Sequence, residues 1–390
     1  MKRQLSLKRQ TLLAWRQMRR EKNRLWIALA GIAFANVLMF MQLGFHDALY
    51  NSSTLLHENL VADLVLVSPQ ARNLLGMDTI SRNRLYQAMS VPGVQSANAL
   101  YINAIDWKNP QTRRKTPILV IGFNPAKPLL NLSEVNQKLD LLKLPGRVLF
   151  DRFSRGDYGK TVAQIEHGET VITELGNQQI RIVGTYNIGP SFGLDGSLIT
   201  SDVNFLHFFP NRSTAGISVG LISLQPGADL PSVTAALKDS LPSDIQVLTR
   251  SGFVELEQGY WRKNTSIGYI FTLGTTMGFL VGVIIVYQIL YSGVTDHLSE
   301  YATLKALGYR DVYLIGVVFQ EAIILSVLGY IPGKLIAYGL YTLTRNATHL
   351  PMFITLDRAI EILILTIIMC SISGIIAMRK LSSADPAELF

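Results

Sequence analysis

The sequence predicts an α-helical membrane protein with four transmembrane helices and a large α+β domain inserted between helices 1 and 2. The first observation is compositional: 48% of the 390 residues are hydrophobic, only 16% are charged, and the mean hydropathy is +0.25. Such values are unusual for a soluble globular chain. The second is that four apolar stretches are long enough to cross a hydrocarbon core of about 30 Å. The third is that a long segment between the first two stretches alternates strand-like and helix-like patterns.

The N-terminal segment 1–24 is strongly basic. Residues 1–26 contain nine Lys or Arg against a single acid, Glu21, and this excess equals the formal charge of +8 on the whole chain. A nucleic-acid-binding protein would carry such a patch on a folded surface. Here the basic run ends where an apolar run begins, which is typical of a cytoplasmic membrane anchor. We therefore expect the lipid bilayer, and not nucleic acid, as the partner of this segment.

Transmembrane helix 1 is expected at 25–49, with an apolar core over 25–45 that contains no charge. This core is longer than the roughly 7–15 apolar residues of a signal peptide, so we expect an uncleaved helix. Helix 2 is expected at 267–294, again without a charge, helix 3 at 312–343 and helix 4 at 359–378.

The distribution of Lys and Arg near the span ends predicts the orientation in the plasma (inner) membrane. The basic N-terminus lies inside, and four spans return the C-terminal tail 379–390, which begins with Arg379 and Lys380, to the same side. The loop 295–311 is then cytoplasmic. The domain 50–266 and the short loop 344–358 are periplasmic.

The segment 50–266 is expected to fold as a periplasmic α+β domain. Runs rich in Val and Ile and bounded by Pro, Gly, Asp or Asn predict strands at 62–67, 95–105, 118–123, 147–150, 179–186, 217–224 and 245–248. Helices are expected at 81–89, 231–241 and 253–263, the second of them starting at Pro231 after Asp229. The middle part, about 125–200, is interpreted as an inserted mostly-β subdomain.

Both ends of this domain are expected to be helical, at 47–60 and 253–264. Membrane helices would then hold the domain on both sides, an arrangement suited to the transmission of movement. The only cysteine, Cys370, lies in the fourth span. The domain therefore has no disulfide and depends on its own hydrophobic core.

Enzymatic chemistry and a bound cofactor are not expected. The nearest match to a phosphate-binding loop is 156–161, G-D-Y-G-K-T, but Ser154 stands where that motif needs its first glycine. No apolar strand leads directly into it, and we expect no amphipathic helix after it. The six histidines are scattered, without the spacing of metal ligands.

The cytoplasmic loop is expected to contain a short amphipathic helix over 295–308, ended by a glycine at the C-cap position. This helix either lies on the lipid interface or docks on a cytoplasmic subunit as a coupling helix. In the second interpretation, coupling to an ATPase is carried by Leu298, Glu300, Tyr301, Leu304, Lys305, Leu307 and Gly308.

Two further features lie inside the spans. Glu321 is an acid well inside helix 3, where a charge is costly; it serves structure or coupling, with Lys305 or Arg310 as possible partners near the cytoplasmic interface. Gly274, Gly278 and Gly282 follow one another at four-residue spacing in helix 2. They form a stripe that lets another helix, from the same chain or a second copy, approach closely.

The C-terminal third resembles a known family. Residues 300–308 read E-Y-A-T-L-K-A-L-G and are followed by Phe319-Gln320-Glu321 and Leu328-Gly329. They resemble the C-terminal block of the MacB/FtsX permease superfamily, roughly E-I-G-x-L-(R/K)-A-L-G followed by Phe and Glu in the third helix. The tail 385–389, D-P-A-E-L, resembles its closing D-P-x-E-A-L. The segments 13–22, 28–34 and 296–298 look specifically like cyanobacterial DevC permeases.

Two positions depart from the pattern of the superfamily. His297 and Ser299 stand where basic residues usually precede the E-I-G motif, and Phe390 replaces the Arg that often ends the tail. The first departure leaves the polar contacts of the coupling helix open.

The resemblance implies a MacB-like outer domain and a permease that works as a homodimer with a separate ABC ATPase subunit, which would hold the ATP and Mg. It also implies a periplasmic adaptor (membrane fusion protein), a TolC-like outer-membrane channel and movement of the outer domain by mechanotransmission. For DevC-like members the implied cargo is a glycolipid or similar amphiphile.

Two other functions are compatible with the same resemblance. One is an FtsX-like signalling subunit that activates a cell-wall hydrolase and transports nothing. The other is a permease that releases lipoproteins toward a carrier. The size of the outer domain and the DevC-like ends favour export with an adaptor.

Overall fold

The computed structural model describes residues 22–300, 303, 307, 309 and 311–383. They form two compact units. The membrane unit comprises residues up to Asp47, 267–346 and 352 onward, and the α+β unit comprises 48–266 and 347–351.

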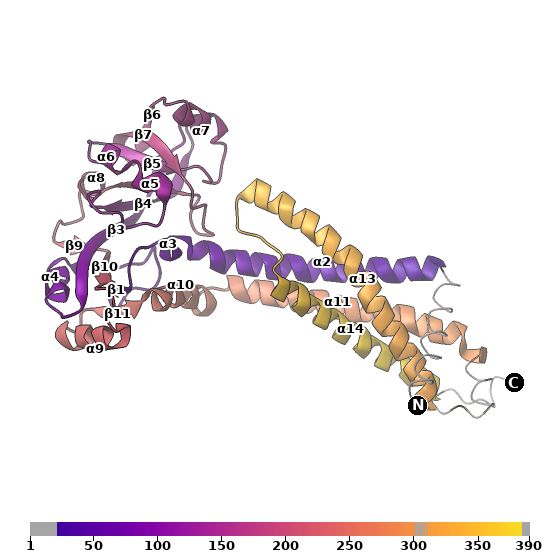
Figure 1. Ribbon diagram of the computed structural model, residues 1–390. Helices are drawn as coiled ribbons and strands as arrows, with labels where there is room; N and C mark the ends of the chain where they lie inside the picture. Colours follow the sequence, from indigo (N-terminus) through magenta and orange to yellow (C-terminus); the bar gives the residue numbers. More distant parts are fainter. Residues whose placement is uncertain (1–21, 301–302, 304–306, 308, 310, 384–390) are drawn as a thin grey trace. The chain divides into compact units, whose positions relative to one another are not determined.

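The membrane unit contains four long helices: α2 (Lys22–Ser53, whose last turns belong to the α+β unit), α11 (Ile267–Asp296), α13 (Asp311–Thr348) and α14 (Leu356–Ser383). Each contains a stretch long and apolar enough to cross a membrane. Figure 1 shows the strands and short helices labelled between α2 and α11 along the chain. The predicted class, four transmembrane helices with an α+β domain inserted after the first, is confirmed.

Small residues and aliphatic side chains form the core of the membrane unit. Ala35 of α2, Leu290 of α11, Ala322 of α13 and Cys370 of α14 all belong to one buried cluster. Polar contacts also cross this interior: the Thr366 hydroxyl of α14 donates to the side-chain oxygen of Asn36 in α2 (2.5 Å), and the Ser373 hydroxyl of α14 donates to the Val283 carbonyl of α11 (2.8 Å). The described parts of the four helices therefore pack as one bundle.

Helix α13 continues through Pro332 as one helix, although proline inside a helix favours a kink or a break. Gly333, next to it, packs tightly on α2, since a Cβ there would lie 2.8 Å from Asn36 Cβ and 3.1 Å from the Ala33 carbonyl oxygen. Proline is tolerated in membrane-spanning helices that pack against neighbouring helices in this way.

The α+β unit is built on a nine-stranded mixed sheet in the order β11-β1-β10-β3-β4-β8-β5-β7-β6, with a separate pair β2-β9. The strand bounds are β1 Leu64–Val67, β2 Ile80–Ser81, β3 Val94–Lys108, β4 Lys115–Phe123, β5 Arg147–Asp151, β6 Val171–Leu175, β7 Gln178–Tyr186, β8 Ser197–Ser201, β9 Gly216–Ile217, β10 Val219–Leu224 and β11 Gln246–Thr249.

The long strand β3 links the two ends of this sheet. Its first half pairs with β10 and its second half with β4. Trp107 near its end also pairs with Leu175 of β6, the last strand in the order. Strands β3, β4, β8, β5, β7 and β6 therefore close into a ring, a small barrel whose sheet continues into β10, β1 and β11.

Both faces of the sheet are buried, and side chains alternate between two cores. In β3, Tyr101 belongs to one cluster and its neighbours Leu100 and Ile102 belong to the other. In β4, Val120 and Ile121 divide in the same way. This explains why the strands read as apolar runs.

Eight helices surround the sheet: α3 (Leu55–Glu58), α4 (Asn83–Met89), α5 (Ser133–Asn136), α6 (Leu139–Leu142), α7 (Gly159–Glu166), α8 (Asp202–Phe208), α9 (Leu230–Ser240) and α10 (Arg250–Asn264) among the described residues. The start of α9 follows its sequence signal: Asp229 caps the helix by accepting from the Ser232 backbone N–H (3.0 Å), and Pro231 lies in the first turn.

All seven expected strands and three expected helices have counterparts, and the run 217–224 is split between β9 and β10. Strands β2, β6 and β8 and helices α5 to α8 were not expected. Strand β8 was not expected because three of its five residues, S-L-I-T-S, are polar. All five are nevertheless buried. The inserted subdomain at about 125–200 stays a prediction. Strand β4, which precedes this segment, pairs directly with β8 at its end.

Candidate functional site

The expected coupling segment lies in the loop between α11 and α13, residues 297–310. Leu298 and Glu300 are helical there, half-buried and exposed respectively. The Leu307 backbone N–H donates to the Thr303 carbonyl (3.0 Å), a helical spacing, and Leu307 is 71% exposed. The expected coupling residues Tyr301, Leu304, Lys305 and Gly308 lie outside the described residues, so their role stays a prediction.

The three glycines of α11 face other helices of the same chain. A Cβ on Gly274 would meet Gln42 (2.4 Å), and one on Gly278 would lie 3.2 Å from Leu38 Cβ, both in α2. A Cβ on Gly282 would lie 2.1 Å from Met369 Sδ in α14 and 2.9 Å from Ala35 Cβ in α2. In this structure the stripe is therefore an internal contact of one chain.

A second glycine pair was not singled out from the sequence. Gly329 and Gly333 of α13 have the same four-residue spacing, and both pack against α2. A Cβ on Gly329 would lie 2.6 Å from the Ile32 side chain. Their spacing was the signal that could have found them. Together the glycines make α2 the helix against which α11 and α13 pack.

Glu321 is half-buried in α13 and has an interaction partner. The expected partners Lys305 and Arg310 lie outside the described residues. The role of Glu321 in structure or coupling therefore stays a prediction.

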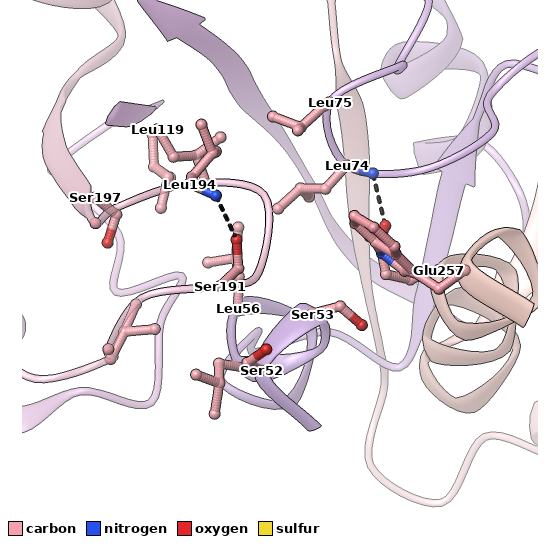
Figure 2. Close-up of a pocket in the computed structure, with 16 residues that line it drawn as sticks. Ser52, Ser53, Leu56, Leu74, Leu75, Leu119, Ser191, Leu194, Ser197 and Glu257 are labelled. Atoms are coloured by element: carbon pink, nitrogen blue, oxygen red, sulfur yellow. Dashed lines mark hydrogen bonds between the residues drawn. The ribbon is translucent and has the colours of Figure 1, made fainter. Parts of the chain in front are cut away.

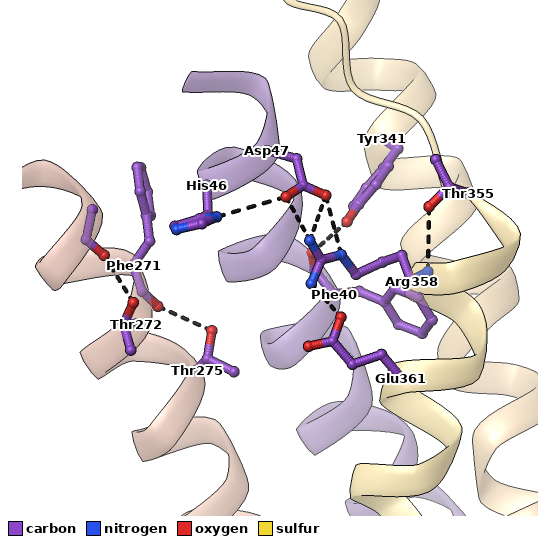
Figure 3. A network of polar contacts seen from close by, with 11 residues as sticks. Phe40, His46, Asp47, Phe271, Thr272, Thr275, Tyr341, Thr355, Arg358 and Glu361 are labelled. Atoms are coloured by element: carbon purple, nitrogen blue, oxygen red, sulfur yellow. Dashed lines mark hydrogen bonds and ion pairs between the residues drawn. The ribbon is translucent and has the colours of Figure 1, made fainter. Parts of the chain in front are cut away.

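A cluster of charged side chains joins α2 and α14, and sequence analysis did not anticipate it (Figure 3). Arg358 of α14 pairs with the carboxylate of Asp47 in α2 through Nε (3.1 Å) and a second nitrogen (2.5 Å). It also pairs with Glu361 (2.6 Å), one turn along α14. The Arg358 side chain is only 13% exposed, and the His46 ring lies 3.6 Å from Asp47. A half-buried bidentate pair of this kind fixes two helices in register.

A small cavity lies within the α+β unit (Figure 2). It has a volume of about 50 Å³ and is lined by the end of α2, α3, the 74–75 segment, β4, the 188–197 loop and α10. Most lining side chains are aliphatic, and the polar ones are four serines and Glu257. The cavity thus brings together segments that are up to 200 residues apart in the sequence.

Glu257 of α10 is a buried carboxylate at one wall of this cavity. Its two oxygens accept from the Leu74 backbone N–H (2.6 Å) and from Trp261 Nε1 (2.8 Å). Burial raises the pKa of Glu257 to about 7, against the lowering effect of these two donors. The carboxyl therefore ties α10 to the 68–77 segment.

His57 of α3 lies beside Glu257, with Nε2 3.8 Å from the carboxylate. The ring is fully buried, tilts against Phe253 (4.3 Å between centroids), and neither nitrogen has a hydrogen-bond partner. Burial lowers the pKa of His57 to about 3, so the ring is neutral. The sequence placed these two residues 200 positions apart and gave no signal of their contact.

Asp151 anchors the loop that forms another wall of the cavity. It is fully buried and accepts from the backbone N–H groups of Phe153 (3.1 Å) and Gly189 (2.7 Å) and from Ser197 Oγ (3.4 Å). Burial raises the pKa of Asp151 to about 6, and these donors oppose the shift. Arg155 holds the same loop through Asp195 (3.1 Å).

The segment that resembled a phosphate-binding loop is a packed structural turn. Contrary to expectation, an amphipathic helix, α7, does follow it. However, the Ser154 hydroxyl donates to the Asp151 carbonyl (2.7 Å), Thr161 is fully buried, and Tyr158 packs against Trp107 and Phe150. The side chain at the last position of the motif is therefore buried away from solvent, where a nucleotide could not reach it. Among the described residues, no group of three or more His, Cys, Asp and Glu is placed to hold a metal ion.

Residues 272–386 match the family described as FtsX-like permease C-terminal. This part of the chain is therefore similar to the C-terminal domain of FtsX-like permeases. The match covers most of α11 together with α13 and α14, and thus the glycine stripe, Glu321 and Arg358. No curated protein matches the sequence.

Three solved structures are each similar to about half of this chain. The periplasmic region of MacB from Actinobacillus actinomycetemcomitans has 10% identity and a TM-score of 0.33, covering 50% of this chain and 91% of the other. The extracellular domain of YknZ, a noncanonic ABC-type transporter from Gram-positive bacteria, has 13% identity and a TM-score of 0.31, covering 48% and 100%. A permease domain from Porphyromonas gingivalis has 11% identity and a TM-score of 0.31, covering 49% and 88%.

Proposed function

We propose that this chain is the permease subunit of an ABC-type tripartite exporter, driven by ATP hydrolysis on a separate ATPase subunit. The observation that carries the proposal is the FtsX-like domain over 272–386, attached to a large α+β unit. The proposal includes a homodimer, a periplasmic adaptor, a TolC-like outer-membrane channel and an amphiphile such as a glycolipid as cargo, as for the DevC-like permeases that the ends of the chain resemble.

The mechanism we propose is mechanotransmission. Closure of an ATPase pair would move the loop between α11 and α13, and α11 would carry that movement along its 30 residues. Only two residues separate the end of α10 at Asn264 from the start of α11 at Ile267. On the other side, α2 continues to Ser53 and is followed at once by α3. Continuous helices resist bending, so both connections favour transfer of movement into the α+β unit.

The first test is affinity purification of the full chain from native membranes in mild detergent, with identification of the co-purifying chains by mass spectrometry. An ATPase together with a periplasmic adaptor is the expected result. An ATPase with a peptidoglycan hydrolase would instead support FtsX-like signalling. An ATPase without an outer partner would support lipoprotein release, and no ATPase would overturn the proposal.

The second test concerns the coupling loop. The double substitution Leu304→Asp and Leu307→Asp should abolish binding of the ATPase subunit while the chain still inserts, because charged side chains would replace the apolar docking surface. The control is Val203→Asp, which replaces one exposed apolar side chain by an aspartate at a 73% exposed position of the α+β unit. Normal assembly of the double variant would contradict the coupling role.

A further inference from the structure

The cavity of the α+β unit combines apolar walls with polar groups that are already satisfied (Figure 2). Its apolar lining includes Leu56, Leu74, Leu119, Ile121, Leu194 and Trp261. Leu56, Leu119 and Leu194 are at most 7% exposed and Ile121 is fully buried, so their positions are fixed by the surrounding core. The walls are thus preformed.

Each polar side chain of the lining has a hydrogen-bond partner within the unit. The Ser52 and Ser53 hydroxyls donate to the carbonyls of Leu49 and Tyr50 (3.2 and 2.8 Å). Ser191 accepts from the Leu194 backbone N–H (3.1 Å), and Ser197 accepts from Tyr186 (2.8 Å). Glu257 accepts from Leu74 and Trp261, as described above. Each of these polar side chains is thus held in place by a hydrogen bond within the unit.

The rest of the lining is aliphatic or aromatic, and a surface of this kind favours an apolar occupant over water, which needs two to four polar partners. With roughly 10–15 Å³ needed per water-sized group, a volume of about 50 Å³ holds about four methylene or methyl groups. An engineered cavity that holds benzene has about 150 Å³, roughly three times this volume. The small volume therefore favours a thin chain over an aromatic ring.

The cavity has an opening, and the residues at it suit an alkyl chain that continues outward. Leu75 lines the cavity and is 46% exposed. A Cβ placed on Gly193 would lie 3.5 Å from Leu75 and 3.7 Å from Trp261, so this glycine leaves room beside both. We infer that the cavity binds the terminal carbons of one unbranched alkyl chain, whose remaining length leaves past Leu75.

The inference rests on the proposed function for the source of the chain, an exported amphiphile, whereas the binding itself depends only on the cavity. It names the part of the cargo that the α+β unit recognises. It also predicts that the cavity does not recognise the head group of the amphiphile.

The test uses the full chain in lipid nanodiscs without ATPase, since detergent tails would compete. The probe is dodecanoate with a photoreactive diazirine next to its terminal methyl group. After illumination, peptide mass spectrometry should find the label within 188–197 or 257–261. An excess of unlabelled dodecanoate should compete, and an excess of glucose should not.

Two variants change the cavity in different ways. Leu194→Trp fills it, and Leu75→Asp places a charge at its half-exposed opening, where it does not disturb the core. Each variant should lower labelling by about tenfold or more, which corresponds to an affinity for the alkyl chain that is about tenfold weaker. Val203→Trp, which adds the same ring as the first variant at an exposed position, should label like the wild type.

Absence of label at these peptides, or equal labelling in Leu75→Asp and the wild type, would overturn the inference. So would label on the surrounding bilayer-facing helices alone, since that reports contact with membrane lipid. The two proposals can be contradicted separately. If the chain still co-purifies with an ATPase but is not labelled, only the inference about the cavity is wrong. If the chain is labelled but does not co-purify with an ATPase, only the exporter proposal is wrong.

Discussion

At the residue scale, the most informative groups are the charges and glycines that the fold buries. Glu257, His57 and Asp151 each have few exposed atoms, and burial moves the pKa of each toward its neutral form. The sequence gave no hint of this, because their partners come from distant segments. Glu257 and Asp151 hold walls of the cavity through hydrogen bonds, whereas His57 packs beside Glu257 without one.

The raised pKa of Glu257 predicts a pH-dependent stability. An acid whose pKa is about 7 when folded and 4.5 otherwise stabilises the fold fully below about pH 4.5 and loses this contribution as the pH rises to 7. The loss is on the order of 3 kcal/mol. The Glu257→Gln side chain has no titratable proton. Its single oxygen can replace only one of the two carboxyl oxygens that accept from the Leu74 N–H and from Trp261 Nε1. We expect it to be less stable than the wild type at pH 5, and the difference to shrink or reverse at pH 8.

Thermal unfolding of the full chain at both pH values measures this difference. The buried neutral His57 acts in the opposite direction over about pH 3 to 6.5 in both proteins, so it cancels in the comparison. Glu255→Gln, an exposed substitution in the same helix, should show one constant difference from the wild type. Parallel curves for Glu257→Gln and the wild type would show that Glu257 is not a buried acid.

Gly196 has no room for a side chain. A Cβ there would lie 2.0 Å from Ser154 Oγ and 3.1 Å from the Ser154 backbone. We expect Gly196→Ala to destabilise the protein by about 1–3 kcal/mol, because the backbone itself must move. Thermal unfolding checks this. Gly159→Ala is the control, since nothing lies within 4 Å of its Cβ position and it begins helix α7; an equal loss in both variants would contradict the packing argument.

At the element scale, the helices of the membrane unit are held by small residues and by one charged cluster. Glycines of α11 and α13 let these helices approach α2, and Arg358 joins α14 to Asp47 of α2. The sequence predicted the α11 stripe from its spacing, and the structure supplies the partner helices. The Arg358–Asp47 pair could not be predicted, because Asp47 lies near the end of the first span and Arg358, now in α14, was expected in the short loop 344–358.

The stripe on α11 leads to a prediction about packing. Gly282→Leu should destabilise the full chain in detergent by about 1–3 kcal/mol, because the new side chain would collide with Met369 and Ala35. A lower denaturation temperature would report this loss. Gly339→Leu in α13 is the matched control, because no atom lies within 4 Å of its Cβ position. A wild-type transition for Gly282→Leu would mean that the contact between α2, α11 and α14 is not formed.

At the scale of the whole molecule, four candidate spans and one inserted α+β unit define a permease-like architecture. Charge near the spans predicts that the α+β unit lies outside and the loop around Leu307 inside. Both carry exposed positions suited to a direct test: Val203 (73% exposed) and Leu307 (71%), while the native Cys370 is buried.

We expect a membrane-impermeant maleimide to label Val203→Cys in intact spheroplasts, and to label Leu307→Cys only after the membrane is permeabilised. Both variants are made in a Cys370→Ser background, which on its own should stay unlabelled in either condition. Labelling of Leu307→Cys from outside would reverse the predicted orientation and remove the loop from any cytoplasmic ATPase.

The sequence by itself determined the membrane class, the four spans, the position of the inserted unit and the relation to FtsX-like permeases. These depend on local signals: uninterrupted apolar length, charge at span ends and a short motif around 300–308. Only the tertiary structure decided which face each glycine packs on, how β3 closes the barrel onto β6, and that Glu257 and Ser197 line one cavity. The physical reason is that burial and pairing between distant segments arise from the packing of the whole chain, whereas hydropathy and helix length are properties of each segment alone.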